Sequence, residues 1–397
     1  MTGLEISNSS DISNLFESIL QIDKGSGLDT VISQYPQIKR NFLFLNLQEY
    51  YRQIENNHLL LQDFISEETP DHTKKILSIC LTLLFFSKKP EFAIVHEAVE
   101  FSKRFKKDKL VNAVLRSLLR ARKKIDHNSQ NLPKLFKANI DKVFSSKNIR
   151  SYIYNSLFHK PINYQISYNE NKNSIYGGKV YLLEKNLHQD CFVQDIGNFE
   201  CIYAIKNLFR SKNILDVCAA PGGKSILLNS YGFIVDAIDK SSSQIKKFKD
   251  NVNRLNLDLE IVQGDFLKST FPKKYESILL DAPCSALGTF RRNPDVASKI
   301  DEKKLLSNQE IQVAMIEKSL KLLDKGGILS YIVCSFHPFE TMSVIDKILQ
   351  KHQDVSLLNI QSDKMIKKEK GYFINPYAFK ELGGSDIFFM SVLQKNK

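Results

Sequence analysis

The chain has 397 residues, of which 43% are hydrophobic and 25% are charged. This balance is typical of a globular protein and too apolar for a chain that is disordered throughout, and the length predicts two or three domains at roughly 100 to 200 residues per domain. Lysine and arginine outnumber aspartate and glutamate by 56 to 44, so the formal net charge is +12. Such a surplus favours a polyanionic partner such as a nucleic acid but says nothing about the fold.

Several classes of protein are not expected from this sequence. The longest apolar run, residues 76–86, is shorter than the roughly 20 residues that span a membrane, so it predicts a buried core helix. The N-terminal stretch MTGLEISNSSDISNLF has neither a basic start nor a sustained apolar segment, so we expect no secretion. The six cysteines are scattered without a C-x-x-C pair, which disfavours a zinc site and favours reduced thiols in the cytoplasm.

Residues 1–125 are predicted to form an all-helical domain. Apolar residues recur at three- and four-residue spacing, and the breaks are Pro36, Pro70 and Pro90. Basic residues flank the apolar stripe of 110–119, and they are Lys103, Arg104, Lys106, Lys107, Lys109, Arg116, Arg120, Arg122, Lys123 and Lys124. Two readings stay open here, because such a cluster forms either a solvated helix face or a patch that contacts phosphates.

The rest of the chain divides into a short middle segment and a long α/β segment. Residues 126–187 are polar and rich in turn formers, which predicts a linker and a small mixed subdomain. From residue 188 to 397 strands and helices alternate, with a Gly326-Gly327 turn before the last predicted strand of the series. The predicted strands are 213–217, 233–238, 259–262, 277–280 and 328–333. One helix is predicted to begin at 224, and two more are predicted at 241–255 and 303–323. This rhythm predicts a parallel sheet with its ligand site at the carboxyl ends of the strands.

The first of these strands runs into a glycine-containing loop, DVCAAPGGKS, at residues 216–225. Small residues and glycines between a strand and a helix allow a ligand to approach the backbone. A Walker A loop would need glycine where Cys218 stands, and the dinucleotide fingerprint G-x-G-x-x-G is missing. A nucleoside cofactor without a pyrophosphate is therefore the remaining candidate.

Carboxylates close three of the following strands. Asp239 suits hydrogen bonds from ribose hydroxyls, Asp265 suits an adenine edge, and Asp281 ends the fourth strand. Each of them alone could equally be a turn or cap residue. Their repetition at strand ends favours a binding site.

Two cysteines follow neighbouring strands: Cys284 in DAPCS and Cys334 in YIVCSFHPFE. A thiolate at the mouth of a cofactor cleft could attack a substrate carbon. Cys80, Cys191 and Cys201 are expected to be small core residues instead.

These residues together resemble the RNA cytosine-C5 methyltransferases, and within them the bacterial 16S ribosomal RNA enzymes of RsmB (Sun, or Fmu) type. DVCAAPGGKS, DAPCSALGTFRRNPD and YIVCSFHPFE look like three of the family's motifs in the family's order. GGSDIFF is similar to its closing segment, with Ile387 where glycine is usual. ILSICLTLLFF, VHEAVEFSKRF and LVNAVLR are similar to a NusB-like RNA-binding domain. The resemblance covers roughly residues 75–122 and 185–394.

The resemblance implies a class I S-adenosylmethionine-dependent methyltransferase domain of Rossmann-like α/β fold, after an all-α NusB-like domain and a small mixed α/β subdomain. It assigns to S-adenosylmethionine the residues Cys218, Ala219, Ala220, Pro221, Gly222, Gly223 and Lys224, with Asp239 on the ribose, Asp265 near the adenine and Asp281 at the junction of cofactor and base. It makes Cys334 the nucleophile that adds to C6 of the cytosine and Cys284 the residue that helps to release the product.

The implied substrate is 16S ribosomal RNA or an assembling small ribosomal subunit. We expect the protein to be a monomer and to have no membrane partner. Methylation of transfer RNA and a non-catalytic role in ribosome assembly are the alternatives. Arg291 and Arg292 could hold phosphates beside the target base or lie in a solvated loop. Two departures, Tyr164 to Ser167 without the family's arginine and Asn198-Phe199-Glu200 in place of Gln or Ser, put the usual RNA target in doubt.

Overall fold

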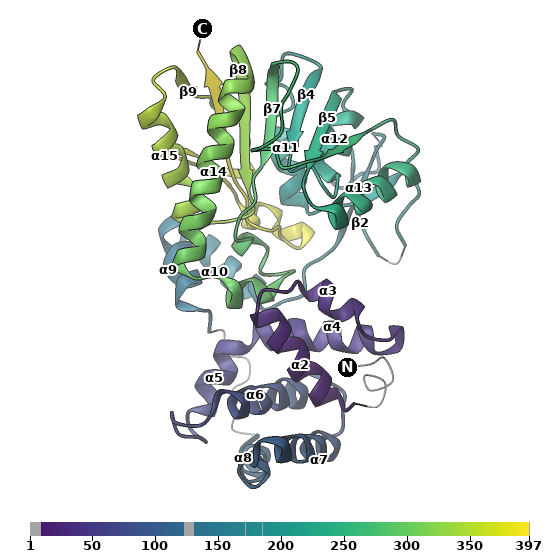
Figure 1. Cartoon of the computed structure of the whole chain (residues 1–397), viewed down its shortest axis with the longest axis vertical. Helices are drawn as coiled ribbons and strands as arrows, with labels where there is room; N and C mark the ends of the chain where they lie inside the picture. Colours follow the sequence, from purple (N-terminus) through teal and green to yellow (C-terminus); the bar gives the residue numbers. More distant parts are fainter. Residues whose placement is uncertain (1–8, 123–130, 171, 185, 397) are drawn as a thin grey trace. The chain divides into compact units, whose positions relative to one another are not determined.

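The computed structural model describes residues 9–122, 131–170, 172–184 and 186–396. It separates into two compact units, one made of Met1–Ala138 with Asn293–Lys299 and the other of Asn139–Arg292 with Ile300–Lys397. Figure 1 colours both by sequence position. Lys123, Lys124 and the start of the predicted linker lie outside the described residues. The three domain limits expected from the sequence stay a prediction.

The first unit is helical, as the sequence predicts. Its elements are α2 (Asp11–Asp23), α3 (Leu28–Ser33), α4 (Gln37–Arg52), α5 (Ile54–Leu61), α6 (Asp71–Phe86), α7 (Glu91–Ser102), the short 3-10 helix η1 (Lys103–Phe105) and α8 (Asp108–Ala121), followed by the start of α9 (Lys134–Val143) and joined by η4 (Pro294–Lys299). Pro36, Pro70 and Pro90 each stand directly before a helix, where the fixed φ of proline suits the helix start.

Helix α6 is the centre of the first unit's core. It carries the apolar run 76–86 and contacts α2, α4, α5, α7 and α8. Ile76, Leu77 and Leu81 are fully buried, which confirms the predicted core helix. Burying such aliphatic side chains contributes roughly 1.5 to 3 kcal/mol each. No helix within the described residues has the length and hydropathy needed to cross a bilayer.

The second unit opens with helices and a small antiparallel sheet. These elements are the end of α9, α10 (Lys147–Leu157), β1 (Tyr164–Ser167), β2 (Val180–Leu182) and β3 (Cys191–Val193), and the sheet order is β2-β1-β3. The sequence predicted a small mixed subdomain in this region without locating α9 or α10. Helix α11 (Ile196–Ile205) then begins at Asp195, whose side chain accepts a hydrogen bond from the backbone N–H of Gly197.

A nine-stranded mixed sheet forms the core of the second unit. The path of the sheet is β10-β11-β12-β8-β7-β4-β5-β6, with β9 paired to β12. Its strands are β4 (Asn213–Val217), β5 (Ile234–Asp239), β6 (Ile261–Gln263), β7 (Tyr275–Asp281), β8 (Leu323–Val333), β9 (Val355–Leu357), β10 (Met365–Lys368), β11 (Gly371–Ile374) and β12 (Phe389–Lys395). Strands β4 to β8 pair in parallel, as predicted, and β9 to β12 pair antiparallel.

Helices alternate with most of the parallel strands (Figure 1), although residues 264–274 between β6 and β7 contain none. They are α12 (Gly223–Ser230), α13 (Ser242–Arg254), α14 (Glu302–Leu322) and α15 (Met342–Lys351), with the 3-10 helices η3 (Leu287–Thr289), η5 (Pro338–Glu340) and η6 (Pro376–Leu382). Ser241 caps α13 by accepting from the backbone N–H of Gln244, as the sequence predicts.

The prediction of a separate Gly326-Gly327 turn before the strand is wrong. Strand β8 already begins at Leu323, and its pairing with β7 breaks register between Leu323 and Ile328. Gly326 lies in this irregular stretch with a φ of 78°. The two glycines therefore form a distortion within the strand, where a positive φ is needed, instead of a turn before it.

Candidate active site

The site is built where the parallel strands end. Strand β4 lies between β5 and β7, and β8 lies beyond β7. The loop 218–224 leaves β4, while Asp239 and Asp281 are the last residues of β5 and β7. Asp265 follows β6, and Cys334 follows β8. Because parallel strands end at the same edge of a sheet, the structure brings the sequence-predicted groups to one edge.

The loop after β4 turns tightly into α12. Cys218 and Gly222 have positive φ values of 61° and 106°. A Cβ added to Gly222 would lie 2.7 Å from the Phe248 ring, so this position requires glycine for space as well as for φ. The backbone of the loop is thereby exposed to close approach by a ligand, and the first turn of α12 lies directly behind it.

Asp216 lies at the end of β4 but inside the core. Its side chain is fully buried and accepts a hydrogen bond of 2.5 Å from the Ser225 hydroxyl. Burial raises the pKa of this carboxyl to about 7, although the bond from Ser225 opposes the shift. Asp216 therefore ties β4 to α12 beneath the loop.

Lys224 turns from the loop toward Asp281. The ammonium nitrogen lies 2.6 Å from the Asp281 carboxylate, and the exposed fractions of the side chains are 5% for Lys224 and 32% for Asp281. Burial lowers the pKa of Lys224, but the charge and hydrogen bond of Asp281 more than offset it, so the net shift is upward. Lys224 thus stays charged and fixes the Asp281 carboxylate at the strand end.

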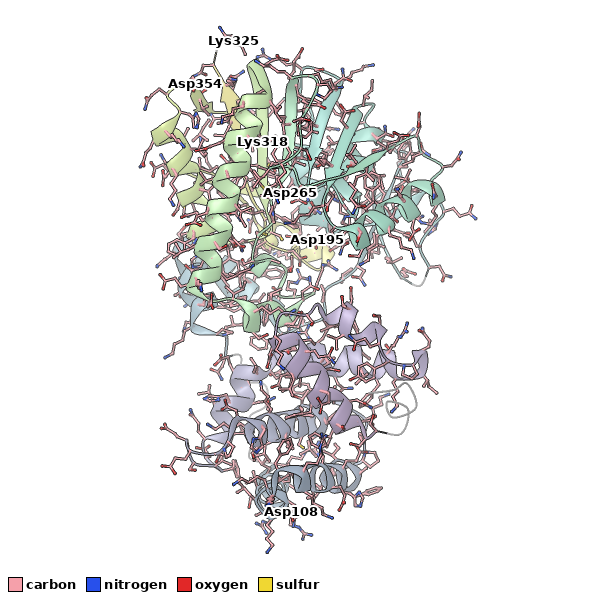
Figure 2. All side chains as sticks on the ribbon, viewed as in Figure 1. Asp108, Asp195, Asp265, Lys318, Lys325 and Asp354 are labelled. Atoms are coloured by element: carbon pink, nitrogen blue, oxygen red, sulfur yellow. The ribbon has the colours of Figure 1, made fainter. Side chains whose placement is uncertain are left out.

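Asp239 links the loop to the next helix. Its two carboxylate oxygens accept from the backbone N–H groups of Ala220, at 3.1 Å, and Ser241, at 2.8 Å. Asp265, labelled in Figure 2, accepts from the backbone N–H of Leu267 at 3.0 Å. Both carboxylates are partly exposed. Since an ionised carboxylate has about four acceptor positions, each can still accept from a ligand.

The residues at this edge fit a nucleoside cofactor. The glycine at 222 leaves room at the backbone, and the two carboxylates Asp239 and Asp265 accept hydrogen bonds of the kind that ribose hydroxyls and an adenine amino group donate. Beside the loop, the buried amide of Gln194 has neither its oxygen nor its nitrogen hydrogen-bonded within the described structure. A Cβ on Gly223 would lie 3.2 Å from that nitrogen, so the unsatisfied amide borders the glycine loop.

The side chains of the two motif cysteines, Cys284 and Cys334, are in contact. The sulfur atoms of Cys284 and Cys334 are 3.3 Å apart, although 50 residues separate them in the sequence, and both side chains are partly exposed. The hydrogen bond with Cys334, followed by burial, raises the pKa of Cys284 well above its usual value. Burial and the contact with Cys334 therefore favour the neutral thiol of Cys284. Cys80, Cys191 and Cys201 are buried, as predicted.

A glycine brings a third segment against the cysteines. The backbone N–H of Gly288 donates to the Cys334 carbonyl, and the Gly288 carbonyl accepts from the backbone N–H of Ile387, both at 3.0 Å. A Cβ on Gly288 would lie 1.9 Å from the Ile387 carbonyl oxygen. The segment with Ile387 thus packs directly on the cysteine loops through its backbone.

The expectation that Arg291 and Arg292 hold phosphates is wrong. Arg291 is buried and donates to the carbonyls of Gly383 and Ser385, both at 2.8 Å. Arg292 forms ion pairs with Asp195 at 2.7 Å and Asp386 at 3.0 Å. Both guanidinium groups therefore contact the C-terminal motif. Arg291 is buried and needs such partners, whereas Arg292 is partly exposed.

The basic cluster of the first unit stays exposed in part. Arg116 and Arg120 are exposed on α8, where they hydrogen-bond to Asn112 and Ser117 of their own helix. Arg122 instead pairs with Glu91. The pair Arg116 and Arg120 thus presents two cations on one face of α8, and the alternatives of a solvated face and a phosphate contact stay open.

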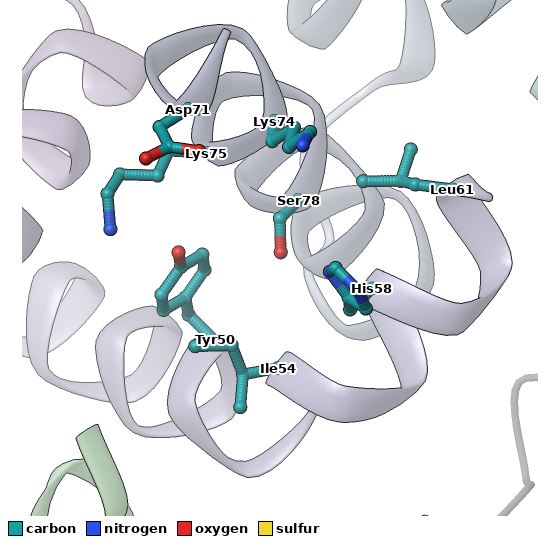
Figure 3. A pocket seen from close by; sticks show the side chains of 8 residues that line it. All are labelled: Tyr50, Ile54, His58, Leu61, Asp71, Lys74, Lys75 and Ser78. Carbon is teal, nitrogen blue, oxygen red and sulfur yellow. The ribbon is translucent and has the colours of Figure 1, made fainter. Parts of the chain in front are cut away.

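The first unit also contains a pocket of about 310 Å³ that the sequence did not indicate (Figure 3). Its lining is Tyr50, Ile54, His58, Leu61, Asp71, Lys74, Lys75 and Ser78. The ammonium of Lys75 pairs with Asp23 at 2.5 Å, and that of Lys74 donates to the Glu67 carbonyl.

Known proteins share both parts of this chain. The profile of the family described as 16S rRNA methyltransferase RsmB/F matches residues 204–394, and that of the NusB family matches residues 4–120. Residues 204–394 belong to the RsmB/F family. Residues 4–120 belong to the NusB family. The resemblance seen in the sequence is therefore confirmed.

Curated relatives cover the RsmB/F part. "Ribosomal RNA small subunit methyltransferase B" of Photorhabdus laumondii is 33% identical over 208 residues, which is 51% of this chain and 46% of that protein. The protein of the same name from Serratia proteamaculans is 37% identical over 152 residues, or 37% of this chain and 35% of that protein. The chain thus matches less than half the length of these relatives.

Solved structures share the fold. The crystal structure of PH0851 has a TM-score of 0.69 and 17% identity, covering 98% of this chain and 99% of that chain. A methyltransferase homologue from Pyrococcus horikoshii has a TM-score of 0.50 and 19% identity, covering 66% of this chain and 100% of that chain. The predicted fold class, a Rossmann-like methyltransferase domain after a NusB domain, is confirmed.

One functional candidate escaped the sequence reasoning. Glu340 is fully buried and lies between the two cysteine loops. It stands six residues after Cys334 inside the quoted motif YIVCSFHPFE, and an acid within the motif of the candidate nucleophile is the signal that could have indicated it.

Proposed function

We propose that this chain methylates C5 of a cytosine in 16S ribosomal RNA, with S-adenosylmethionine as the methyl donor. The observation that carries the proposal is the contact between Cys284 and Cys334 at 3.3 Å, beside the Lys224–Asp281 ion pair. The RsmB/F family match and the relatives named as ribosomal RNA small subunit methyltransferase B support the substrate class.

The loop 218–224, with Asp239 and Asp265, would hold the cofactor. When bound, S-adenosylmethionine supplies an electrophilic methyl group. The chain's residues act on the other reactant, because C5 of cytosine is a poor nucleophile until the ring is activated. The Cys334 thiolate forms a bond to C6 and pushes an electron pair into the ring. A proton or hydrogen bond donated at N3 would stabilise that charge, and we assign this role to Asp281 in its protonated form.

Release reverses the addition. After methylation a base takes the C5 proton, and the electron pair of the C5–H bond restores the C5–C6 double bond. The C6–sulfur bond then breaks, so Cys334 departs as a thiolate. Cys284 touches Cys334 and is the group we assign to this step. The base must leave its stack to reach the sulfur and the cofactor together, which favours a single-stranded or opened target.

The first unit would supply RNA affinity. NusB-family membership of residues 4–120 and the exposed cations Arg116 and Arg120 support this role. Phosphate contacts of this kind position an RNA without reading its sequence. We propose 16S ribosomal RNA, alone or in an assembling subunit, as the partner of a monomeric protein in the cytoplasm.

Labelled methyl transfer tests the proposal. The full chain is incubated with S-adenosylmethionine carrying a labelled methyl group and with unmodified 16S ribosomal RNA or transfer RNA. We expect label in the 16S RNA at a cytosine that bisulfite sequencing identifies as 5-methylated. Label in transfer RNA alone would show that transfer RNA is the substrate instead. If no RNA is labelled and calorimetry detects no cofactor binding, the non-catalytic alternative is favoured.

A further inference from the structure

A buried carboxylate lies between the two cysteine loops of the site. Cys284 is followed by Ser285, and Cys334 is followed by Ser335. Both serines are buried, and both hydrogen-bond to the side chain of Glu340, which is fully buried. One acid therefore contacts the residue next to each cysteine.

The hydrogen bonds to Glu340 use both carboxylate oxygens. Oε1 accepts from the backbone N–H of Ser285 at 2.7 Å and from the side-chain amide of Asn308 at 2.8 Å. Oε2 accepts from the Ser335 hydroxyl at 2.6 Å and from the Ser285 hydroxyl. The two hydroxyl oxygens are themselves 3.3 Å apart. All four donors are neutral groups, and four donors satisfy a buried carboxylate without a cation.

The rest of Glu340 is also fixed. Its backbone carbonyl accepts from the Tyr331 hydroxyl of β8 at 2.7 Å, and its backbone N–H donates to the His337 carbonyl at 3.0 Å. Asn308 lies on α14, so three elements converge on the carboxylate: the loop after β7, the loop after β8, and α14. A buried carboxylate is costly to place, and an apolar side chain would fill the same space without that cost. We therefore expect the Glu340 carboxylate to offset its cost by fixing the positions of its hydrogen-bond partners.

We propose that Glu340 is a positioning residue that sets the distance between the two cysteine sulfurs by holding Ser285 and Ser335 on one carboxylate. The negative charge of Glu340 also acts on Cys284, whose pKa it raises together with the hydrogen bond from Cys334 and burial. The inference rests on the proposed function for its catalytic meaning, while the distance between the sulfurs can be tested without RNA or cofactor.

Four variants and one matched control separate positioning from folding. Ser285→Ala and Ser335→Ala, alone and together, each remove one hydroxyl donor to Glu340 and keep the carboxylate. Glu340→Gln keeps the size and one acceptor oxygen. Ser330→Ala is the control, because Ser330 is buried on the strand that leads to Cys334, and its hydroxyl has no hydrogen-bond partner among the described residues.

The first readout is cross-linking of the two thiols by diamide, which takes up two electrons and two protons as the sulfurs form a disulfide. Mass spectrometry of unreduced peptides measures the rate of the Cys284–Cys334 bond. We expect fast cross-linking in the parent and in Ser330→Ala, and a rate lower by at least about tenfold in the double serine variant, since even one lost bond to a charged acceptor is worth a factor of about ten. Circular dichroism melting confirms that each variant is folded.

The second readout separates the two chemical steps with RNA. We expect Ser335→Ala to slow formation of the covalent RNA adduct, and Ser285→Ala to let it accumulate, because the first displaces Cys334 and the second displaces Cys284. A loss of folded protein would lower both steps equally. Glu340→Gln should fall between the parent and the double serine variant in both readouts.

Parent-like cross-linking in the double serine variant would overturn the positioning role. An effect of Ser330→Ala as large as that of the double variant would also overturn it. If the parent cross-links quickly and the serine variants slowly, but the parent transfers no labelled methyl group to 16S ribosomal RNA, the proposed function fails and the positioning of the thiols stands.

Discussion

Lys224 and Asp281 are 57 residues apart in the sequence, yet their charged groups lie 2.6 Å apart at the end of β7. Their environments differ, since Lys224 is nearly inaccessible whereas about a third of the Asp281 side chain is exposed. Removal of Lys224 and removal of Asp281 should therefore lower the free energy of unfolding by different amounts. Water can solvate the carboxylate that remains, but not the buried ammonium.

Asp281→Asn should destabilise the fold more than Lys224→Met. Removing one partner of a buried ion pair costs about 3 to 5 kcal/mol when the remaining charge is inaccessible, and less when it is partly solvated. Urea unfolding followed by circular dichroism measures both, because the chain has no tryptophan to report by fluorescence. A larger loss of unfolding free energy in Lys224→Met than in Asp281→Asn would contradict the assignment of the buried charge.

The stability contribution of Asp216 should fall as the pH rises from about 4 to about 7. Burial raises the folded-state pKa to about 7, above the ordinary value of 3.8, so the folded state binds more protons than the unfolded state in this window. The stabilisation is complete below the unfolded pKa and decreases by up to about 1.4 kcal/mol per pH unit as the pH approaches the folded pKa.

Comparison with Asp216→Asn isolates this effect. The variant keeps the side chain's size and lacks the titration, so the difference in unfolding free energy between parent and variant should shift in the variant's favour between pH 5 and pH 8. Asp386, whose pKa burial also raises to about 7, is present in both proteins and cancels. A difference that is constant across this range would show that Asp216 does not titrate there.

Reversal of Arg116 and Arg120 to Glu should weaken RNA binding and leave cofactor binding unchanged. Both side chains are exposed on α8 in the first unit, while the candidate cofactor residues belong to the second. If both contact phosphates, the slope of log affinity against log salt should decrease by about one to two units. The same reversal at the exposed Lys303 and Lys304 of α14 is the charge-matched control. Equal loss in both variants would indicate an effect of net charge alone.

Local signals explain what the sequence predicted well. The prediction of the strand 213–217 is correct at both ends, because the Pro- and Gly-containing loop that follows limits how far a strand can extend. Ser241 was correctly expected to cap a helix, since the hydroxyl acts within one turn. The strand-end acids reach one edge because parallel strands align their ends, a rule that holds without knowledge of side-chain positions.

Contacts between residues far apart in the sequence explain what the sequence did not predict. Arg292 pairs with Asp195 and Asp386, which lie 97 and 94 residues away, so no local pattern distinguishes this ion-paired arginine from an unpaired one. Glu340 likewise gains its meaning from Ser285, 55 residues earlier. Such partners become visible only when the fold brings their elements together.

The covalent adduct tests the central claim most directly. Cys284→Ala is incubated with 16S ribosomal RNA and S-adenosylmethionine, and the products are separated under denaturing conditions. We predict an RNA–protein adduct that accumulates in Cys284→Ala and is lost in the double variant with Cys334→Ala, because Cys334 forms the bond and Cys284 is needed to break it. An adduct that persists without Cys334, or full methyl transfer by Cys334→Ala, would contradict the account.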